Sequence, residues 1–213
     1  MVLTNAIYFK GDWATQFKVK STRELPFRMA SGKSAKTPMM FQKGNFGFFQ
    51  DAGVQVLEMP YKGEKVSMVV LLPRKVDGLV SLEKKLAAGK LSGWLGKLRR
   101  VKVDTLFPKF KMTSRFDLSS KLQNLGMKRA FGAADFSGMD GTRNLYLTAV
   151  FHKAFVEVNE EGTEAAAATG AVVGLRSIRR GPSFRADHPF LFLIRDKATG
   201  SILFLGRYAR PAS

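Results

Sequence analysis

The chain contains no cysteine, so disulfides, thiol catalysis and cysteine-based zinc sites are excluded. It has only two histidines, His152 and His188. That leaves little from which to build a metal centre or a catalytic triad, and we expect neither a metal nor a cofactor. Asp187 precedes His188, but adjacency in sequence does not place two side chains in a proton relay, so no catalytic dyad is expected. The sequence therefore argues against an enzyme.

Long apolar runs are also missing. The longest, residues 68–72 and 190–194, have the length of strands and are far too short to cross a bilayer. No basic segment followed by an apolar one appears at the N-terminus, so no signal peptide is visible. We expect no association with a membrane. The absence of cysteine fits a cytosolic protein without forbidding a secreted one.

Acidic residues are scarce: 17 Asp and Glu stand against 35 Lys and Arg, which gives a net charge of +18. The positive charge is spread along the chain, with denser clusters at residues 97–102, 121–129 and 176–185. One interpretation is a solvated cationic surface, and the other is a site for a heparin-like polyanion. Either predicts salt-sensitive binding to polyanions, without specific recognition of nucleic acid.

What is present fits a folded protein, because 213 residues with 45% hydrophobic content can bury a core. Residues 3–9, 46–49, 54–59, 66–72, 101–106, 190–194 and 202–205 have the pattern of strands. Residues 79–98 show helical spacing that Gly89 and Gly93 divide, and residues 117–126 form a short helix with a glycine stop. The order of elements predicts an α+β fold with mostly antiparallel sheet and no linker between domains.

Two segments, residues 3–9 and residues 145–158, have features of buried strands. Residues 3–9 contain the polar Asn5 in a segment that looks buried, so Asn5 is expected to find hydrogen-bond partners. Residues 145–158 form a long apolar stretch that suits a central strand covered on both sides.

Residues 159–183 break this pattern. A connection of about 25 residues between two apolar strands is longer than a routine loop, and loops of that length are usually functional or disordered. Its first half is almost entirely small, so a segment there could enter a sheet as an extra strand without steric obstruction. Its second half carries exposed basic residues, which suit the acidic S1 pocket of a trypsin-like protease.

Several segments together resemble the serpin family of serine protease inhibitors. Residues 159–169 (Asn-Glu-Glu-Gly-Thr-Glu-Ala-Ala-Ala-Ala-Thr) are similar to the hinge of the inhibitory reactive loop. Residues 184–194 (Phe-Arg-Ala-Asp-His-Pro-Phe-Leu-Phe-Leu-Ile) resemble the C-terminal signature. Residues 3–13 are similar to the third strand of sheet A with the family's breach tryptophan. Residues 106–110 and 204–207 also match, so the resemblance runs along the whole chain.

The resemblance implies a suicide mechanism, in which a protease cleaves the loop, forms an acyl-enzyme and is carried along as the loop inserts into sheet A. In the family's register Arg176 is the P1 residue and Ser177 is P1′, which implies a trypsin-like serine protease as partner. Arg179 and Arg180 are competing cleavage points. The implied hinge consists of Glu161, Gly162, Thr163, Glu164, Ala165, Ala166, Ala167, Ala168 and Thr169.

The resemblance also assigns Asn5, Trp13 and His152 to the shutter and breach, which control the opening of sheet A. A purely structural role as satisfied core polar residues remains open for Asn5 and His152. His188 is expected in a structural turn before the last hairpin.

The family's fold is about twice as long as this chain, which begins within the third strand of sheet A. We therefore interpret residues 1–213 as the C-terminal portion of a single serpin domain, with the reactive loop at about 159–183 and without the N-terminal helical part. Exposed apolar surface follows from this. The resemblance favours an extracellular monomer. A non-inhibitory serpin-like protein, a polyanion-binding protein and an inactive truncated fragment are the alternatives, and the four hinge alanines disfavour the non-inhibitory one.

Overall fold

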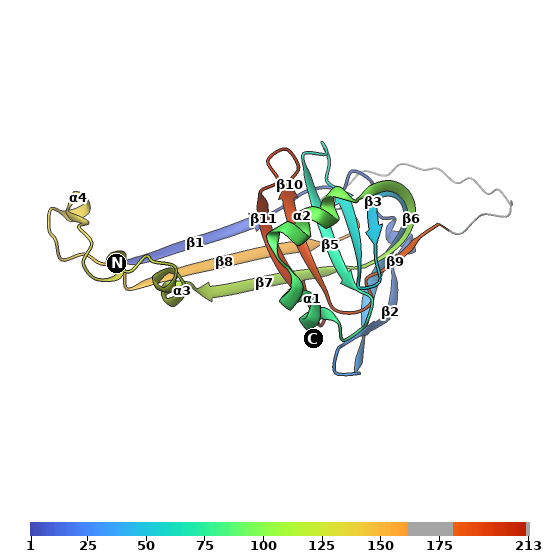
Figure 1. Cartoon of the computed structure of the whole chain (residues 1–213), viewed down its shortest axis with the longest axis horizontal. Coiled ribbons are helices and arrows are strands. Elements are labelled where there is room, and N and C mark those ends of the chain that lie inside the picture. The colour runs from blue at the N-terminus through green and yellow to red at the C-terminus, as the bar shows by residue number, and fades with distance from the viewer. Residues whose placement is uncertain (162–180, 212–213) are drawn as a thin grey trace. The chain divides into compact units, whose positions relative to one another are not determined.

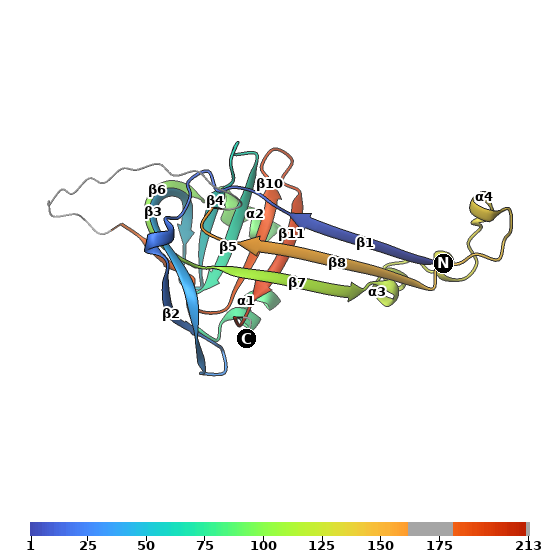
Figure 2. The ribbon, with the colours of Figure 1, turned by 180° about the vertical axis from the view of Figure 1, so that it is seen from behind.

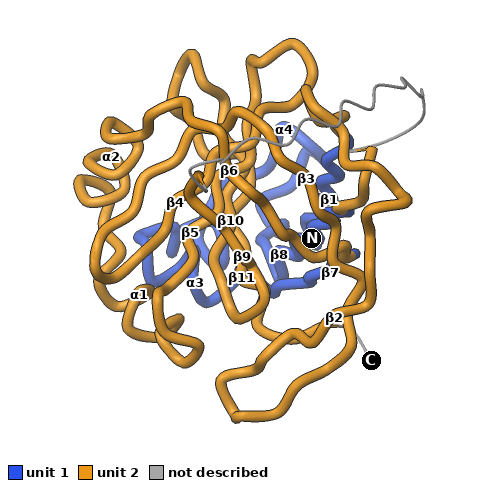
Figure 3. The backbone as a smooth tube through the Cα atoms, turned by 90° about the vertical axis from the view of Figure 1, so that its right-hand side faces the viewer, with its two compact units in different colours: residues 1–10, 111–157 blue, residues 11–110, 158–213 orange. Residues whose placement is uncertain are grey.

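The structure is a computed structural model that describes residues 1–161 and 181–211. The chain divides into two compact units, coloured separately in Figure 3. Unit 1 consists of residues 1–10 and 111–157, and unit 2 consists of residues 11–110 and 158–213. In the described part of the chain, no helix is long and apolar enough to cross a membrane.

Unit 1 is built on a three-stranded sheet with the order β1-β8-β7 (Figures 1 and 2). The strands are β1 (Val2–Phe9), β7 (Phe110–Asp117) and β8 (Ala149–Val158). β1 and β8 run parallel in unbroken register, from Val2 opposite Ala149 to Phe9 opposite Val156. Short helices lie between β7 and β8: α3 (Ser119–Asn124), η2 (Arg129–Phe131) and α4 (Ser137–Asp140).

The sheet of unit 1 is thinly covered. Val2 and Leu3 are each 53% exposed, and Tyr8 is 57% exposed although its ring stacks on that of Phe155. Since apolar residues in strands normally pack against a second layer, β1 leaves much apolar surface open to solvent. The expectation of exposed apolar surface is confirmed for this strand.

Unit 2 contains an eight-stranded sheet in the order β11-β10-β5-β4-β3-β6-β9, with β2 also paired to β3. Its described strand pairs are antiparallel, apart from the parallel pair of β6 and β9. The strands are β2 (Arg23–Arg28), β3 (Ser34–Gln50), β4 (Val54–Pro60), β5 (Val66–Pro73), β6 (Arg99–Pro108), β9 (Ser183–Arg185), β10 (Phe190–Asp196) and β11 (Ile202–Tyr208).

The long strand β3 connects the two ends of this sheet. Its first part pairs with β2, from Ser34 to Met39, and its last part pairs with β4, from Gly47 to Gln50. Along the opposite edge, Met39 to Phe48 pair with β6. One strand can thus serve two groups of neighbours, because each uses a different stretch of its backbone hydrogen-bonding groups.

Both faces of the sheet are packed. The helices α1 (Leu79–Lys85) and α2 (Ala88–Gly96) place Leu82, Leu91 and Trp94 on the apolar face of β4, β5 and β10 (Figure 1). A second cluster is aromatic and joins the rings of Phe107, Phe110, Phe190, Phe192 and Tyr208. The stability of unit 2 rests on this double burial.

The α+β fold with mostly antiparallel sheet is confirmed, and most predicted strands appear. β2, β7 and the first part of β3 were missed. The helical stretch does divide in two, but the division falls at Leu86 and Ala87, where the backbone becomes extended, and not at the glycines, which lie inside α2. Burial of Asn5 is wrong: this residue is exposed on β1.

Candidate functional site

The long connection between β8 and β9 is held at both ends. We name residues 159–161 its N-terminal root and residues 181–185 its C-terminal root. The hinge residues from Gly162 to Thr169, the predicted reactive bond Arg176–Ser177 and the competing Arg179 and Arg180 lie outside the described residues. The candidate site therefore comprises the two roots and the strands β1, β6 and β8.

Trp13 holds the N-terminal root from one side. Its indole N–H donates to the carbonyl of Asn159 at 2.9 Å, and its backbone N–H donates to the carbonyl of Glu161 at 3.1 Å. The ring is only 4% exposed and stacks on Tyr61, with centroids 4.5 Å apart. Burial raises the pKa of the Tyr61 phenol above its ordinary value. The predicted breach residue thus fixes the backbone on which the loop begins.

Glu160 is the most buried charged group of the N-terminal root, at 4% exposure. Its two carboxylate oxygens have separate donors: Thr22 Oγ1 at 2.7 Å and Lys109 Nζ at 2.9 Å. Its carbonyl accepts the backbone N–H of Phe17 at 2.8 Å. A buried charge is tolerated only when it is paired and hydrogen-bonded, and this one is both.

The protonation of Glu160 follows from these contacts. Burial raises the pKa of its carboxyl, but the hydrogen bonds from Thr22 and Lys109 outweigh burial and hold the pKa below its ordinary value. Glu160 is therefore a carboxylate at neutral pH, which is the form that binds Lys109.

The C-terminal root lies against β6. Ser183, Phe184 and Arg185 pair in parallel with residues 104–106, and the side chain of Phe184 is fully buried. Gly181 approaches β6 so closely that a Cβ atom on it would lie 2.7 Å from the carbonyl oxygen of Lys102. Only glycine fits there without a backbone shift.

The strand β6 and the residue that follows it contact both roots. The middle of β6 pairs with the C-terminal root, and Lys109, which follows its last residue, binds Glu160 of the N-terminal root. The two ends of the loop are thus held by one short stretch of the chain, residues 104–109.

The shutter candidates Asn5 and His152 come together in unit 1, since they are register partners on β1 and β8. The ring of His152 stacks on that of Phe116 at 6.5 Å. β1 and β8 are direct neighbours and pair with each other over the whole length of β1.

His188 and Asp187 follow the C-terminal root. His188 is 6% exposed, with Nδ1 2.9 Å from Asp187 Oδ1 and Nε2 2.8 Å from the carbonyl oxygen of Pro73. The side chains of these two neighbours touch. The second ring nitrogen faces a backbone carbonyl and not a nucleophile, so the pair has the geometry of a buried turn.

Comparison with known proteins now decides the family. The family model described as "Serpin (serine protease inhibitor)" matches residues 1–211. The chain belongs to the serpin family. The description of this family names inhibitors and not enzymes, in agreement with the prediction that this chain is not an enzyme.

Individual serpins give the same result. The leukocyte elastase inhibitor of Xenopus laevis is 45% identical over 219 residues, covering 99% of this chain and 58% of the relative. Plasminogen activator inhibitor 2 of Homo sapiens is 46% identical over 221 residues, covering 99% and 53%. The crystal structure of uncleaved ovalbumin superimposes with a TM-score of 0.86 at 35% identity, covering 99% of this chain and 54% of ovalbumin. This serpin chain thus spans little more than half the length of these relatives.

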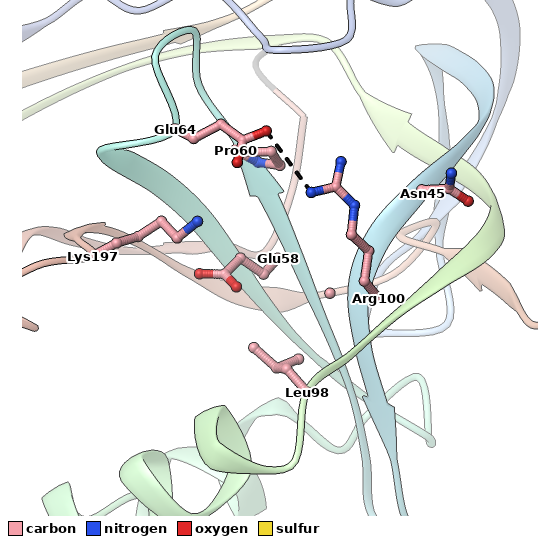
Figure 4. A pocket seen from close by; sticks show the side chains of 8 residues that line it. Asn45, Glu58, Pro60, Glu64, Leu98, Arg100 and Lys197 are labelled. Atoms are coloured by element: carbon pink, nitrogen blue, oxygen red, sulfur yellow. Dashed lines mark ion pairs between the residues drawn. The ribbon is translucent and has the colours of Figure 1, made fainter.

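A pocket in unit 2 lies apart from the residues that the sequence singled out. It has a volume of about 220 Å³ and is lined by Asn45, Gly47, Glu58, Pro60, Glu64, Leu98, Arg100 and Lys197 (Figure 4). Arg100 and Glu64 form a loose ion pair across it at 3.8 Å. Within residues 1–161 and 181–211, no group of three metal-ligating side chains occurs.

Three residues of this serpin site escaped sequence reasoning: Thr22, Lys109 and Glu160. Lys109 sits inside a quoted family motif, and Glu160 adjoins the hinge, but nothing local in the sequence links them. A buried carboxylate beside a long loop is a signal that only burial and distance can supply.

Proposed function

We propose that this chain acts as a serpin-type inhibitor of trypsin-like serine proteases, with the bond Arg176–Ser177 as bait. Cleavage leaves the protease esterified to Arg176, and residues 162–169 then enter between β1 and β8 as a new strand. Every side chain in residues 162–169 except that of Glu164 is small, so bulk does not obstruct the insertion. The chain's membership of the serpin family and its similarity to relatives named as inhibitors support protease inhibition as the general activity.

The observation that carries this proposal is the direct pairing of β1 with β8. The loop leaves the end of β8, so a strand that turned back there would run antiparallel to both neighbours. Insertion breaks one ladder of hydrogen bonds and makes two, because the new strand pairs on both edges. The thinly packed sheet of unit 1 offers little resistance to this separation.

The choice of target rests on Arg176. The relative from Xenopus laevis is named for leukocyte elastase. The S1 pocket of elastase is small, whereas that of trypsin ends in an aspartate that pairs with arginine. We therefore propose that the present chain differs from that relative in the class of protease it traps.

The first experiment mixes the purified chain with trypsin and separates the products on a denaturing gel, with mass spectrometry of each band. A covalent band near the summed mass, with cleavage after Arg176, supports the proposal. Arg176→Ala should abolish that band, and the matched control with Arg179→Ala and Arg180→Ala should retain it. Clean cleavage at Arg176 with free active trypsin contradicts trapping by this chain.

A second experiment tests insertion itself. Ala6 and Lys153 are exposed register partners on β1 and β8, and the chain has no other cysteine to interfere. Neighbouring strands lie about 4.8 Å apart, within the range that a disulfide spans. The oxidised double variant Ala6→Cys/Lys153→Cys should be cleaved but lose at least about tenfold of the covalent complex. Reduction should restore it, and an unchanged yield would exclude insertion between these strands.

A second candidate function, polyanion binding, is favoured by one feature. Lys18, Lys20 and Arg23 are exposed around Thr22, which holds Glu160. A sulfated polysaccharide bound there would lie beside the N-terminal root. Replacing the three cations by serine should reduce the slope of log affinity against log salt by about three. Affinity for heparin that does not change with salt would exclude this function.

A non-inhibitory role stays possible within the family, and a chain that is only cleaved by trypsin would favour it or an inactive fragment. The comparisons do not support an extracellular location. The expected monomer stays a prediction, which sedimentation analysis would test.

A further inference from the structure

A short linker joins the C-terminal root to the core of unit 2. Residues 186–189 lead from β9 to β10, and Ala186 within it is fully buried. The backbone N–H of Ala186 donates to the carbonyl of Leu106 on β6 at 2.9 Å. Whatever holds this linker therefore also holds the C-terminal root against β6.

The imidazole of His188 holds the linker from within. One ring nitrogen faces the carboxylate of Asp187 and the other faces the carbonyl of Pro73, the last residue of β5. Both partners can only accept hydrogen bonds when Asp187 is ionised. A neutral imidazole has one N–H, so it would turn a lone pair toward an acceptor oxygen. Only the doubly protonated ring donates both bonds.

The surroundings keep Asp187 ionised. Burial raises the pKa of its carboxyl, but the hydrogen bonds and charges of His188 and Arg28 outweigh burial and hold the pKa below its ordinary value. Arg28, at the end of β2, binds Asp187 Oδ1 at 2.8 Å, and Arg185 of the C-terminal root lies 3.8 Å from Oδ2. The backbone N–H of Arg28 also donates to the carbonyl of Asp187. Among the described residues, the Asp187 carboxylate therefore lies between the imidazole and two guanidinium groups.

We propose that His188 and Asp187 are positioning residues, in which the doubly protonated imidazole clasps the linker to β5 and so keeps the C-terminal root paired with β6. The clasp itself does not depend on the proposed function. Its consequence for inhibition rests on the proposed function: before cleavage, the C-terminal root limits the positions that the bond Arg176–Ser177 can take, so a loose root should slow the first attack of the protease on that bond. The clasp is closed when both ring nitrogens carry a proton and opens when one of those protons is lost.

The protonation state is measured directly by nitrogen NMR of the two histidine rings. His152→Gln leaves one ring and assigns the signals. We expect both nitrogens of His188 to carry protons at pH 5. A single ring proton on His188 at pH 5 would overturn the proposal.

The holding action is measured by hydrogen exchange of the Ala186 amide, expressed as protection relative to the unfolded chain. Between pH 5 and 8, the range in which histidine changes charge, protection should fall about tenfold. His188→Lys keeps a cation and should stay protected across the range, whereas His188→Gln should stay weakly protected. His152→Gln should retain the fall. A flat profile in the unaltered chain would overturn the proposal, even if one of the variants fails to fold.

Inhibition provides the last readout. The rate of cleavage after Arg176, divided by the rate at which the same protease cleaves a small substrate, should fall over the same pH interval for the unaltered chain and stay flat for His188→Lys. If the chain traps no protease at all, the NMR of the histidine rings and the hydrogen exchange of the Ala186 amide still test the clasp. The two proposals can therefore fail separately.

Discussion

The two units use the same element, a β-sheet, in opposite ways. In unit 2 the sheet is packed on both faces, and residues such as Phe107, Phe190 and Met39 are fully buried. In unit 1 the strand β1 is exposed along most of its length, and its contact with β8 is mainly the backbone ladder. The difference indicates that side-chain packing stabilises the sheet of unit 2 more than the sheet of unit 1.

The largest expected effect contrasts the two sheets directly. Phe190 packs against Phe107, Phe110 and Tyr208, so Phe190→Ala should lower the free energy of unfolding by about 3–5 kcal/mol. Tyr8→Ala, which removes the exposed stack on Phe155, should cost about 1 kcal/mol. Urea unfolding of both variants measures this. Equal losses would mean that unit 1 is as firmly packed as unit 2.

The next effect tests the N-terminal root. Lys109→Met removes one donor from the buried Glu160 carboxylate, so it should destabilise the protein by about 1–3 kcal/mol. Glu160→Gln in the same background should recover part of that loss, because no unpaired charge remains. A double-mutant cycle on urea midpoints gives the coupling, and additive losses would contradict a direct ion pair.

The C-terminal root is tested by Gly181→Ala. The new Cβ would meet the carbonyl of Lys102, and this overpacking should cost about 1–2 kcal/mol. Hydrogen exchange should show faster exchange at the Asp104 amide, which donates to Pro182. Gly132→Ala, where a Cβ meets nothing within 4 Å, is the matched control and should leave that amide unchanged.

The smallest effect is on the response to acid. The pKa of the Glu160 carboxyl is lowered on folding, so its contribution is present above the ordinary carboxyl pKa and is lost as the pH falls through the folded value. Stability should therefore decline on acidification, and less steeply in Glu160→Gln. Urea midpoints across the acid range measure this. If the midpoint falls with pH at the same slope in both proteins, Glu160 does not contribute to the acid response.

Sequence patterns predicted the strands of unit 2 that are buried on both faces. β5 and β10 read as unbroken apolar runs, because every side chain in them meets the core. β2 and β7 were missed, since each carries several charged or polar residues and lacks such a run. Their strand state comes from pairing with β3 and with β8, which a local pattern does not contain.

The candidate site divides in the same way. The small residues of the hinge and the tryptophan at position 13 are visible in the sequence, and the family motifs give them a role. The expectation for Asn5 failed, because an apolar neighbourhood in sequence does not guarantee a covering layer in space. The ion pair of Glu160 and Lys109 was not visible, since its partners are separated by most of β7, β8 and the segment between them.

By itself, the sequence determined the α+β class, the absence of thiol chemistry, the position of the unusual loop and the family, because these follow from composition, local periodicity and motifs. Only the tertiary structure decided that residues 104–109 contact both roots of the loop, and that a histidine ring lies between a carboxylate and a carbonyl. Those facts depend on contacts between residues far apart in the chain, and such contacts are set by packing and burial.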